Sequence, residues 1–229
     1  MNRYFAIQQA ERAADIYIFG DIVPFAILPG DVSGNSIVNQ IKNLDVDVIR
    51  VHINSYGGAV SEGWAIYSAL REHPAKIVTY GDGFVASAAL YPFMAGDERY
   101  ASNLSAYFFH QVMTFASGYA EDLRAAADEA DVLTEIGMAA FTERAGMSED
   151  TVRQLMENET WLSPQQALEY GVATAIVSDQ VPRLQQGVKK LLMQKITGMA
   201  PADPSTLYAP TPKTDPKPNN INIMQLFKL

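Results

Sequence analysis

A serine and a histidine in this chain have the surroundings that acyl-transfer chemistry requires. Ser87 lies among small side chains in the segment from Gly83 to Ala89, and His110 directly follows the apolar stretch 106–109. A serine hydroxyl is a weak nucleophile near neutral pH, but a neutral histidine within hydrogen-bond reach can accept its proton during attack. Ser87 and His110 therefore predict a nucleophile and its general base, if the fold brings them together. A serine in such a place otherwise serves as a capping residue.

Two backbone features can supply the electrostatic stabilisation that this chemistry also needs. A pair of glycines, Gly57 and Gly58, follows Asn54-Ser55-Tyr56 between an expected strand and an expected helix. Because glycine has no Cβ, backbone N–H groups there can approach an anion or a carbonyl oxygen closely, although an ordinary tight turn also explains the pair. Ser87 itself stands at the start of an expected apolar helix, whose free N–H groups stabilise a developing oxyanion.

A third group must orient the imidazole, and the sequence offers several acidic side chains after His110. They include Asp122, Asp128, Glu157 and Glu159, and their spacing does not choose among them. The other two histidines have structural explanations. His52 alternates with the apolar face of its strand, and His73 lies in the last turn of a helix, where a cation complements the helix dipole.

The composition excludes several other kinds of chemistry and partner. The 229 residues contain no cysteine, which removes thiol nucleophiles, disulfides and cysteine-based metal sites. The spacing of the three histidines matches no metal motif, so we do not expect a catalytic metal. The formal charge of −9 repels phosphate backbones and anionic lipids, and the longest nearly uncharged segment, 83–96, is too short to span a bilayer. We therefore expect neither nucleic acid nor a membrane as a partner.

The elements that must position these residues alternate between strand and helix patterns. We expect strands at 17–19, 46–53, 77–80, 106–109 and 173–177, and helices at 33–44, 59–72, 84–94 and 118–145, followed by two shorter helices capped by Ser148 and Ser163. A turn is expected at Gly81-Asp82-Gly83. This alternation is typical of an α/β protein with a mostly parallel sheet covered by helices.

The expected long helix at 118–145 carries an apolar stripe formed by Leu133, Ile136, Gly137, Ala140 and Phe141. Such a stripe indicates a face that packs on the interior, and at this length part of it can also meet another subunit. Both explanations stay open at the level of sequence.

The composition changes near residue 200, where six of the twelve prolines fall within 201–218. We interpret 1–14 as an N-terminal segment, 15–198 as the catalytic domain ending in a basic helix at 181–196, and 199–229 as a proline-rich linker and tail. The short apolar patch at 221–229 is a docking helix, a segment removed by cleavage or a frayed terminus. Residues 1–16 contain no apolar stretch long enough for a signal peptide, so we expect a cytoplasmic protein.

Four motifs, in this order, resemble those of the ClpP family of self-compartmentalising serine peptidases across roughly residues 15–180. They are Ile53-Asn54-Ser55-Tyr56-Gly57-Gly58, Gly83-Phe84-Val85-Ala86-Ser87, Phe109-His110-Gln111 and the run from Trp161 to Gly171. Each motif alone is weak, and the ordered combination is specific. The resemblance implies a ClpP and crotonase-like spiral of ββα units with a long protruding helix, and a serine endopeptidase that needs no cofactor.

The resemblance also implies a role for each site residue. Ser87 is the nucleophile and His110 the general base, while the backbone N–H groups of Gly57 and Ala88 form the oxyanion hole and Gly58 contacts the substrate. Glu159 falls on the orienting aspartate of the family, with Asn158 beside it as a rival. The implied partners are a protein or peptide substrate and further copies of the chain in a ring, heptameric or in stacked rings.

Three residues depart from the family pattern. Tyr56 replaces the usual proline, Ala89 replaces a glycine after the nucleophile, and Val112 stands where the housekeeping enzyme has proline. These departures resemble the phage and prophage branch, which implies capsid, scaffold or portal proteins as partners in place of, or beside, a Clp ATPase. Two alternatives remain: an acyl-CoA hydratase or isomerase of the crotonase type, and a ring-forming assembly protein without activity.

Overall fold

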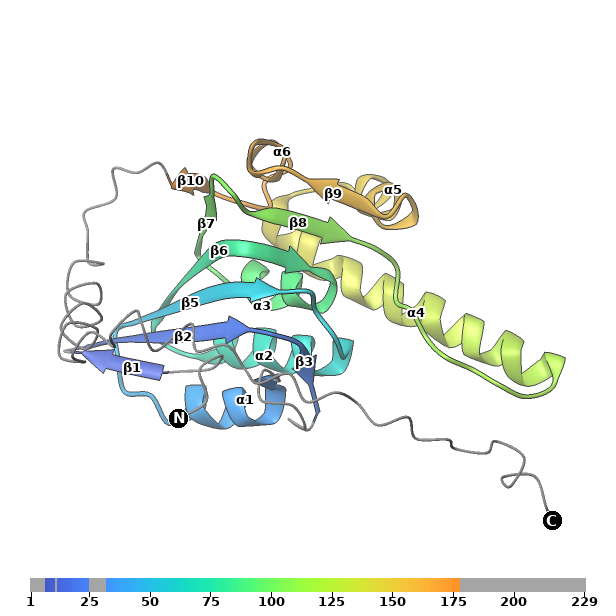
Figure 1. Cartoon of the computed structure of the whole chain (residues 1–229), viewed down its shortest axis with the longest axis horizontal. Coiled ribbons are helices and arrows are strands. Elements are labelled where there is room, and N and C mark those ends of the chain that lie inside the picture. The colour runs from blue at the N-terminus through green and yellow to red at the C-terminus, as the bar shows by residue number, and fades with distance from the viewer. Residues whose placement is uncertain (1–6, 11, 25–31, 178–229) are drawn as a thin grey trace, which may run out of the picture. The chain divides into compact units, whose positions relative to one another are not determined.

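The computed structural model describes residues 7–10, 12–24 and 32–177, which form an α/β fold (Figure 1). The strands are β1 (Ile7–Ala10), β2 (Ala13–Phe19), β3 (Ile22–Val23), β4 (Val32–Ser33), β5 (Val48–Ser55), β6 (Lys76–Ala86), β7 (Glu98–Ser102), β8 (Ala106–Phe109), β9 (Thr160–Leu162) and β10 (Ala175–Val177). The helices are α1 (Gly34–Lys42), α2 (Val60–Glu72), the 3-10 turn η1 (Ser87–Ala89), α3 (Leu90–Met94), α4 (Ala120–Ala145), α5 (Glu149–Glu157) and α6 (Pro164–Glu169).

The main sheet is mostly parallel, as predicted. Its strand order is β1-β2-β5-β6-β7-β10, and a branch leads from β6 through β8 to β9. The pairs β1-β2 and β8-β9 are antiparallel, whereas β2, β5, β6, β7, β8 and β10 pair in parallel. β6 serves two neighbours: its first half pairs with β7 and its second half with β8. The end of β6 therefore lies between the ends of β5 and β8.

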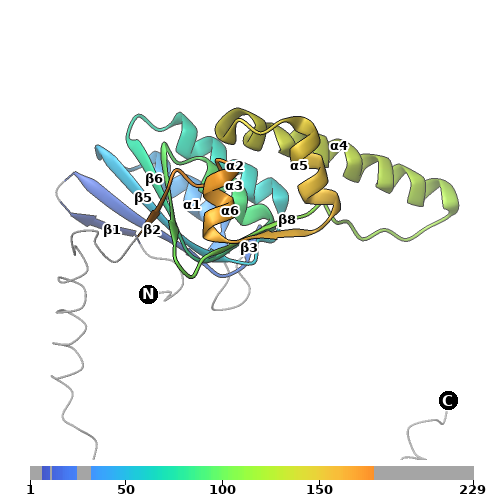
Figure 2. The same ribbon diagram turned by 90° about the horizontal axis from the view of Figure 1, so that it is seen from above.

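One face of this sheet is packed against helices. Buried and more exposed side chains alternate along the strands, and the buried ones point to this face. In β2 and β5 every second side chain is buried, including Ile16, Ile18 and Ile53. Burying a side chain of this size contributes roughly 2 kcal/mol. Helices α1, α2 and α3 lie together on this side of the sheet, and the N-terminal half of α4 protrudes beyond it (Figure 2).

The predicted helix at 84–94 was wrong at its start. Phe84, Val85 and Ala86 continue β6 and pair with 106–108 of β8, so the helix begins only at Ser87. The predicted turn at 81–83 is likewise part of the strand. Both glycines in this segment leave room for neighbouring side chains. A Cβ on Gly81 would clash with the Tyr107 hydroxyl, and a Cβ on Gly83 would clash with the Asn54 side chain.

The predicted helix caps are confirmed. Ser33, Ser148 and Ser163 each accept a hydrogen bond from the backbone N–H three residues later, and Gln166 completes the capping box of α6. The expected stripe on the long helix is confirmed in part. Gly137 and Phe141 are buried, but Ile136 is 55% exposed, although the neighbouring Gly137 and Met138 are buried, so Ile136 lies on the solvent side of the helix.

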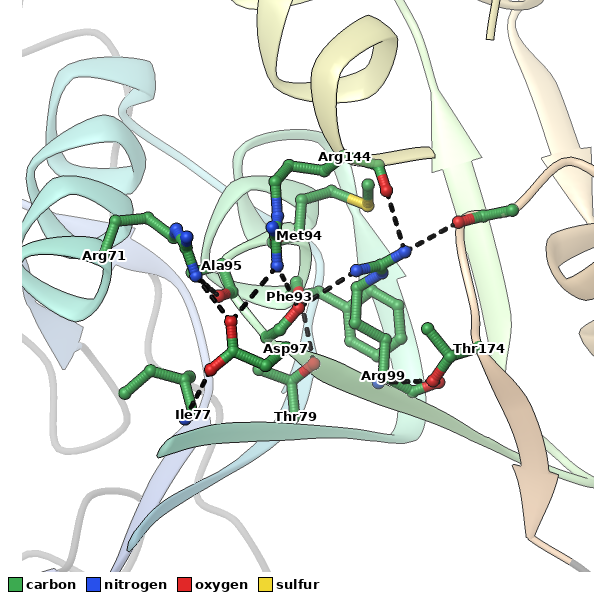
Figure 3. A network of polar contacts seen from close by, with 12 residues as sticks. Arg71, Ile77, Thr79, Phe93, Met94, Ala95, Asp97, Arg99, Arg144 and Thr174 are labelled. Atoms are coloured by element: carbon green, nitrogen blue, oxygen red, sulfur yellow. Dashed lines mark hydrogen bonds and ion pairs between the residues drawn. The ribbon is translucent and has the colours of Figure 1, made fainter. Parts of the chain in front are cut away.

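A buried arginine links the C-terminal ends of α3, α4 and α6 through hydrogen bonds (Figure 3). The Arg99 guanidinium, on β7, donates to the carbonyl oxygens of Gly96, Arg144, Gly171 and Val172 at 2.7 to 3.0 Å. Burial lowers the pKa of Arg99 to about 10. Nearby, Arg71 binds Asp97, whose other oxygen accepts the Ile77 N–H at 3.1 Å. This network fixes the C-terminal end of α4 against the turn that follows α3.

Several expectations concern residues outside the described ranges. The helix at 181–196, the proline-rich tail and the domain boundary at residue 198 all fall there. The segment assigned to the N-terminus contributes β1, which pairs with β2 at the sheet edge. Among the helices that the structure describes, none is long and apolar enough to cross a membrane.

Candidate active site

The structure brings Ser87 and His110 together. Ser87 directly follows β6, and His110 directly follows β8, the parallel neighbour of the end of β6. Because parallel neighbours end at the same edge, the two side chains meet, and His110 Nε2 lies 2.6 Å from Ser87 Oγ. At this distance the hydroxyl donates to a neutral imidazole, which can therefore take the serine proton during attack on a carbonyl carbon.

Ser87 has an unusual backbone conformation with a φ of 55°. This left-handed region costs an L-residue roughly 1 kcal/mol, so the surrounding packing must hold it. Gly63 of α2 lies so close that a Cβ there would be 2.7 Å from the Ala88 carbonyl oxygen. Helix α2 therefore packs closely against η1, and this packing holds the turn that carries Ser87 at the end of β6.

The glycine pair lies directly against this turn. A Cβ on Gly57 would fall 2.7 Å from Ser87 Cβ and 2.9 Å from the Ala88 nitrogen, and Gly57 has a φ of 100°. Both conditions require glycine. The carbonyl oxygen of Gly57 accepts the Ile22 N–H at 2.7 Å, which pins the loop to β3. The Asn54 side chain accepts the Phe84 N–H at 3.0 Å and joins the loop to β6.

The N–H groups of the glycine pair differ in their hydrogen bonding. The Gly57 N–H donates to Ser55 Oγ at 3.0 Å. The Gly58 N–H has no hydrogen-bond partner among the residues that the structure describes. The loop also lies close to the Ala88 nitrogen, so backbone N–H groups of the loop and of the turn gather near Ser87.

The electrostatic surroundings of His110 favour the neutral imidazole. Burial lowers the pKa of His110, and the Glu159 charge and a backbone hydrogen bond at Gln111 oppose that shift in part. The net direction is below the usual value of 6.5, so the ring is ready to accept a proton at neutral pH.

Glu159 lies near His110 but is not hydrogen-bonded to it. Its charge raises the pKa of His110, yet no hydrogen bond between the two side chains is present in the described part of the chain. Glu159 follows the C-cap of α5, Asn158, and has a φ of 48°, a position at which helices usually have glycine. Its carboxylate is exposed and would have to move to reach the imidazole.

A family model described as Clp protease matches residues 30–180, which include Ser87, His110, the glycine pair and Glu159. This chain belongs to the Clp protease family. It is 31% identical over 160 residues to the ATP-dependent Clp protease proteolytic subunit 2 of Treponema pallidum, covering 66% of this chain and 80% of the relative. It is 29% identical to subunit 2 of a Synechococcus species, over 74% of this chain and 90% of the relative.

A solved structure, a mutant of ClpP1 from Listeria monocytogenes, has the same fold, with a TM-score of 0.61 at 24% identity over 74% of this chain and 92% of that one. The likeness confirms the ClpP-like α/β fold that the motifs predicted. Membership of the Clp protease family in turn makes the chain a serine peptidase.

In this Clp protease family member the remaining acidic candidates have other surroundings. The Asp122 carboxylate accepts the Tyr119 N–H at 2.8 Å and caps α4. Asp128 lies exposed on α4, and Glu157 lies exposed at the end of α5. The other histidines have structural partners, as predicted. His52 Nδ1 lies 2.8 Å from Asp82, and His73 Nε2 lies 3.1 Å from the Leu44 carbonyl oxygen.

A cavity of about 420 Å³ opens beside Ser87 and His110. Its helix-side wall consists of the apolar side chains of Leu90, Tyr91, Phe141 and Met156. A second part of the lining, which comes from the glycine loop and from β8 and β9, includes Tyr56, Phe108 and Trp161. Sequence reasoning named none of these wall residues as functional. Phe84 and Ala86, like Ala106 and Phe108, are two residues apart, and this spacing puts each pair on one face of its strand. The expected helix at 84–94 hides that spacing for Phe84.

Proposed function

We propose that Ser87 and His110 hydrolyse peptide bonds through an acyl-enzyme, and the observation that carries this proposal is the 2.6 Å contact of their side chains beside the cavity. Ser87 Oγ bonds to the scissile carbonyl carbon while its proton passes to His110. The proton then moves to the leaving amine as the C–N bond breaks. A water that gives its proton to His110 attacks the ester, and collapse of the second tetrahedral intermediate returns the proton to Ser87.

The tetrahedral oxyanion is held by backbone donors of the nucleophile turn and the glycine loop. The proposed donors are the N–H groups of Ala88 and Gly57, as the family resemblance implies. In this structure the Gly57 N–H is occupied by Ser55 Oγ, so Gly58, which also borders the cavity, is the better placed of the two glycines. Glu159 is the proposed orienting group, with Asn158 as its rival.

Serine-directed chemistry tests the assignment. The full chain and its Ser87→Ala variant are incubated with a fluorophosphonate probe and with a set of internally quenched peptides. Labelling and cleavage by the parent chain, both lost in Ser87→Ala at unchanged thermal stability, would support the proposal. Cleavage that survives the substitution would refute it. Neither labelling nor cleavage by a folded parent chain would favour an inactive assembly protein, and turnover of an acyl-CoA without labelling would favour the crotonase-type alternative.

We also propose that the chain works as a cytoplasmic homo-oligomeric ring, either heptameric or in stacked rings. The protruding half of α4 supports this, because it exposes apolar side chains that contact with a neighbouring copy of the chain would bury. They are Leu123 and Val132, which are 45% and 55% exposed. Light scattering of the purified chain would give the mass of the assembly, and a monomeric mass would refute the ring.

The finer proposal is an enzyme of phage or prophage origin that processes capsid, scaffold or portal proteins, whether or not a Clp ATPase also supplies substrate. The departures at Tyr56, Ala89 and Val112 support it, and so does the proline-rich composition of 199–229, which is typical of a segment open to proteolysis. Mass spectrometry of the chain after incubation with and without a serine-directed inhibitor tests the second point. Inhibitor-sensitive truncation near residues 200–220 is the expected result, and an intact chain in both samples would count against it.

A further inference from the structure

Four aromatic side chains form a continuous row that ends at the imidazole of His110. We call Tyr56, Phe84, Trp161 and Phe108 the aromatic row. Tyr56 and Phe84 have ring centroids 4.8 Å apart, Phe84 and Trp161 5.6 Å, and Trp161 and Phe108 4.6 Å. Phe108 in turn stacks on His110 at 5.4 Å with an interplanar angle of 19°.

Strand register explains why the row exists. Ala86 is the partner of Phe108 across β6 and β8, and Phe108 is the partner of Trp161 across β8 and β9. Phe84 lies two residues before Ala86 and so projects from the same face of the sheet. This is the face away from the buried wall of the cavity.

The row is open to solvent although it consists of large aromatic rings. Tyr56 is 65% exposed, Trp161 46% and Phe84 38%. A contiguous group of exposed aromatic side chains usually marks a site that binds a ligand or another protein. Because Tyr56, Phe108 and Trp161 also line the cavity that holds Ser87, the occupant of this surface is the peptide that Ser87 cleaves.

The position of His110 indicates which side of the scissile bond the row receives. His110 must protonate the leaving amine, so the leaving residue passes beside its ring. In an extended peptide, neighbouring side chains point to opposite sides. If the residue before the scissile bond enters the apolar helix-side wall, then the residue after it points towards the aromatic row.

We propose that the aromatic row, with Trp161 at its centre, is a subsite that selects an aromatic side chain directly after the scissile bond. Stacked and edge-on aromatic contacts favour such a side chain over a small or charged one. This inference rests on the proposed peptidase function and adds to it the substrate class.

Internally quenched peptides that differ only in the residue after the scissile bond test the subsite. The set keeps leucine before the bond and varies the next residue among tryptophan, phenylalanine, alanine and aspartate, with cleavage positions verified by mass spectrometry. For the full parent chain we expect kcat/KM to be about tenfold higher with an aromatic residue than with alanine. In Trp161→Ala the ratio of the two kcat/KM values should fall to within about twofold, whatever the absolute rate of that variant.

Two further variants keep the test decisive. Tyr56→Ala removes the most exposed ring of the row and should lower the same ratio even if Trp161→Ala fails to fold. Tyr170→Ala removes an exposed aromatic side chain that does not line the cavity, and it should leave the ratio unchanged. Equal ratios in the parent, Trp161→Ala and Tyr56→Ala chains would overturn the subsite alone, as would a preference found only before the scissile bond. If the parent chain cleaves none of the peptides and no serine probe labels it, the proposed function fails as well.

Discussion

Ser87 Oγ meets His110 Nε2 at 2.6 Å while the Ser87 backbone is held in the left-handed region at a φ of 55°. The two facts belong together. A strand that continued past Ala86 in extended form would carry the hydroxyl along β6, whereas the left-handed turn directs it towards the end of β8, where the imidazole lies. The reactive geometry is therefore obtained at the expense of backbone stability.

This strain predicts a difference between two inactive variants. Ser87→Gly relieves the left-handed conformation, whereas Ser87→Ala retains it, so the glycine variant should be more stable by about 1 kcal/mol. Urea denaturation of both variants measures the difference. Equal midpoints would show that the turn is not strained, and loss of peptidase activity in both variants serves as the internal control.

The surroundings of His110 predict the acid limb of the pH profile. Catalysis needs the neutral ring, and burial lowers the pKa of His110 below 6.5 despite the opposing charge of Glu159. Activity should therefore persist to lower pH than an ordinary histidine allows and fall as the ring becomes protonated. Removing the negative charge in Glu159→Gln lowers the pKa further and should move the acid limb of kcat/KM to still lower pH. A shift to higher pH in that variant would contradict the assigned proximity of the two groups.

Glu159 occupies a backbone position that suits glycine better, and this predicts opposite effects on stability and activity. Glu159→Gly should raise the free energy of unfolding by roughly 0.5 to 1 kcal/mol, because the residue after the C-cap of α5 has a φ of 48°. If the carboxylate orients His110, the same change should lower kcat by about tenfold or more. Urea denaturation and peptide cleavage are measured in parallel. Asn158→Ala is the matched comparison, and a loss of activity in that variant alone would transfer the orienting role to the neighbouring amide.

The local patterns that could be predicted from sequence were those whose physical cause is itself local. Ser33, Ser148 and Ser163 cap helices because a serine hydroxyl reaches a backbone N–H three residues on, whatever surrounds it. The pairing of Ser87 with His110 came from the family resemblance, because the expected elements placed Ser87 inside a helix and did not show that it follows the strand next to β8.

The errors arose where a distant strand decides the conformation. Phe84 to Ala86 is apolar and short, and such a run suits a helix or a strand equally well until β8 is present to pair with it. The aromatic row depends on that register and on β9, which lies far later in the chain, so its composition could not be foreseen. Gly81 and Gly83, interpreted as a turn, mark instead the close approach of Tyr107 and Asn54.

Arg99 predicts a large loss of stability for a substitution that leaves the chemistry untouched. It is 5% exposed, and no carboxylate lies within ion-pair distance of its guanidinium in the described ranges, so four carbonyl oxygens balance its charge. In Arg99→Met these oxygens lose a donor in a buried place, which should lower the free energy of unfolding by about 3 kcal/mol. Arg99→Lys should recover little of this, because an ammonium cannot reproduce the planar fork. Lys76→Met, which removes an exposed ion pair with Glu98, is the control and should have a much smaller effect. Urea denaturation gives the free energy of unfolding of the three variants. The kcat per folded molecule should stay near that of the parent, because Arg99 contacts neither Ser87 nor His110. An Arg99→Met chain as stable as the parent would show that water replaces the guanidinium at no cost in stability.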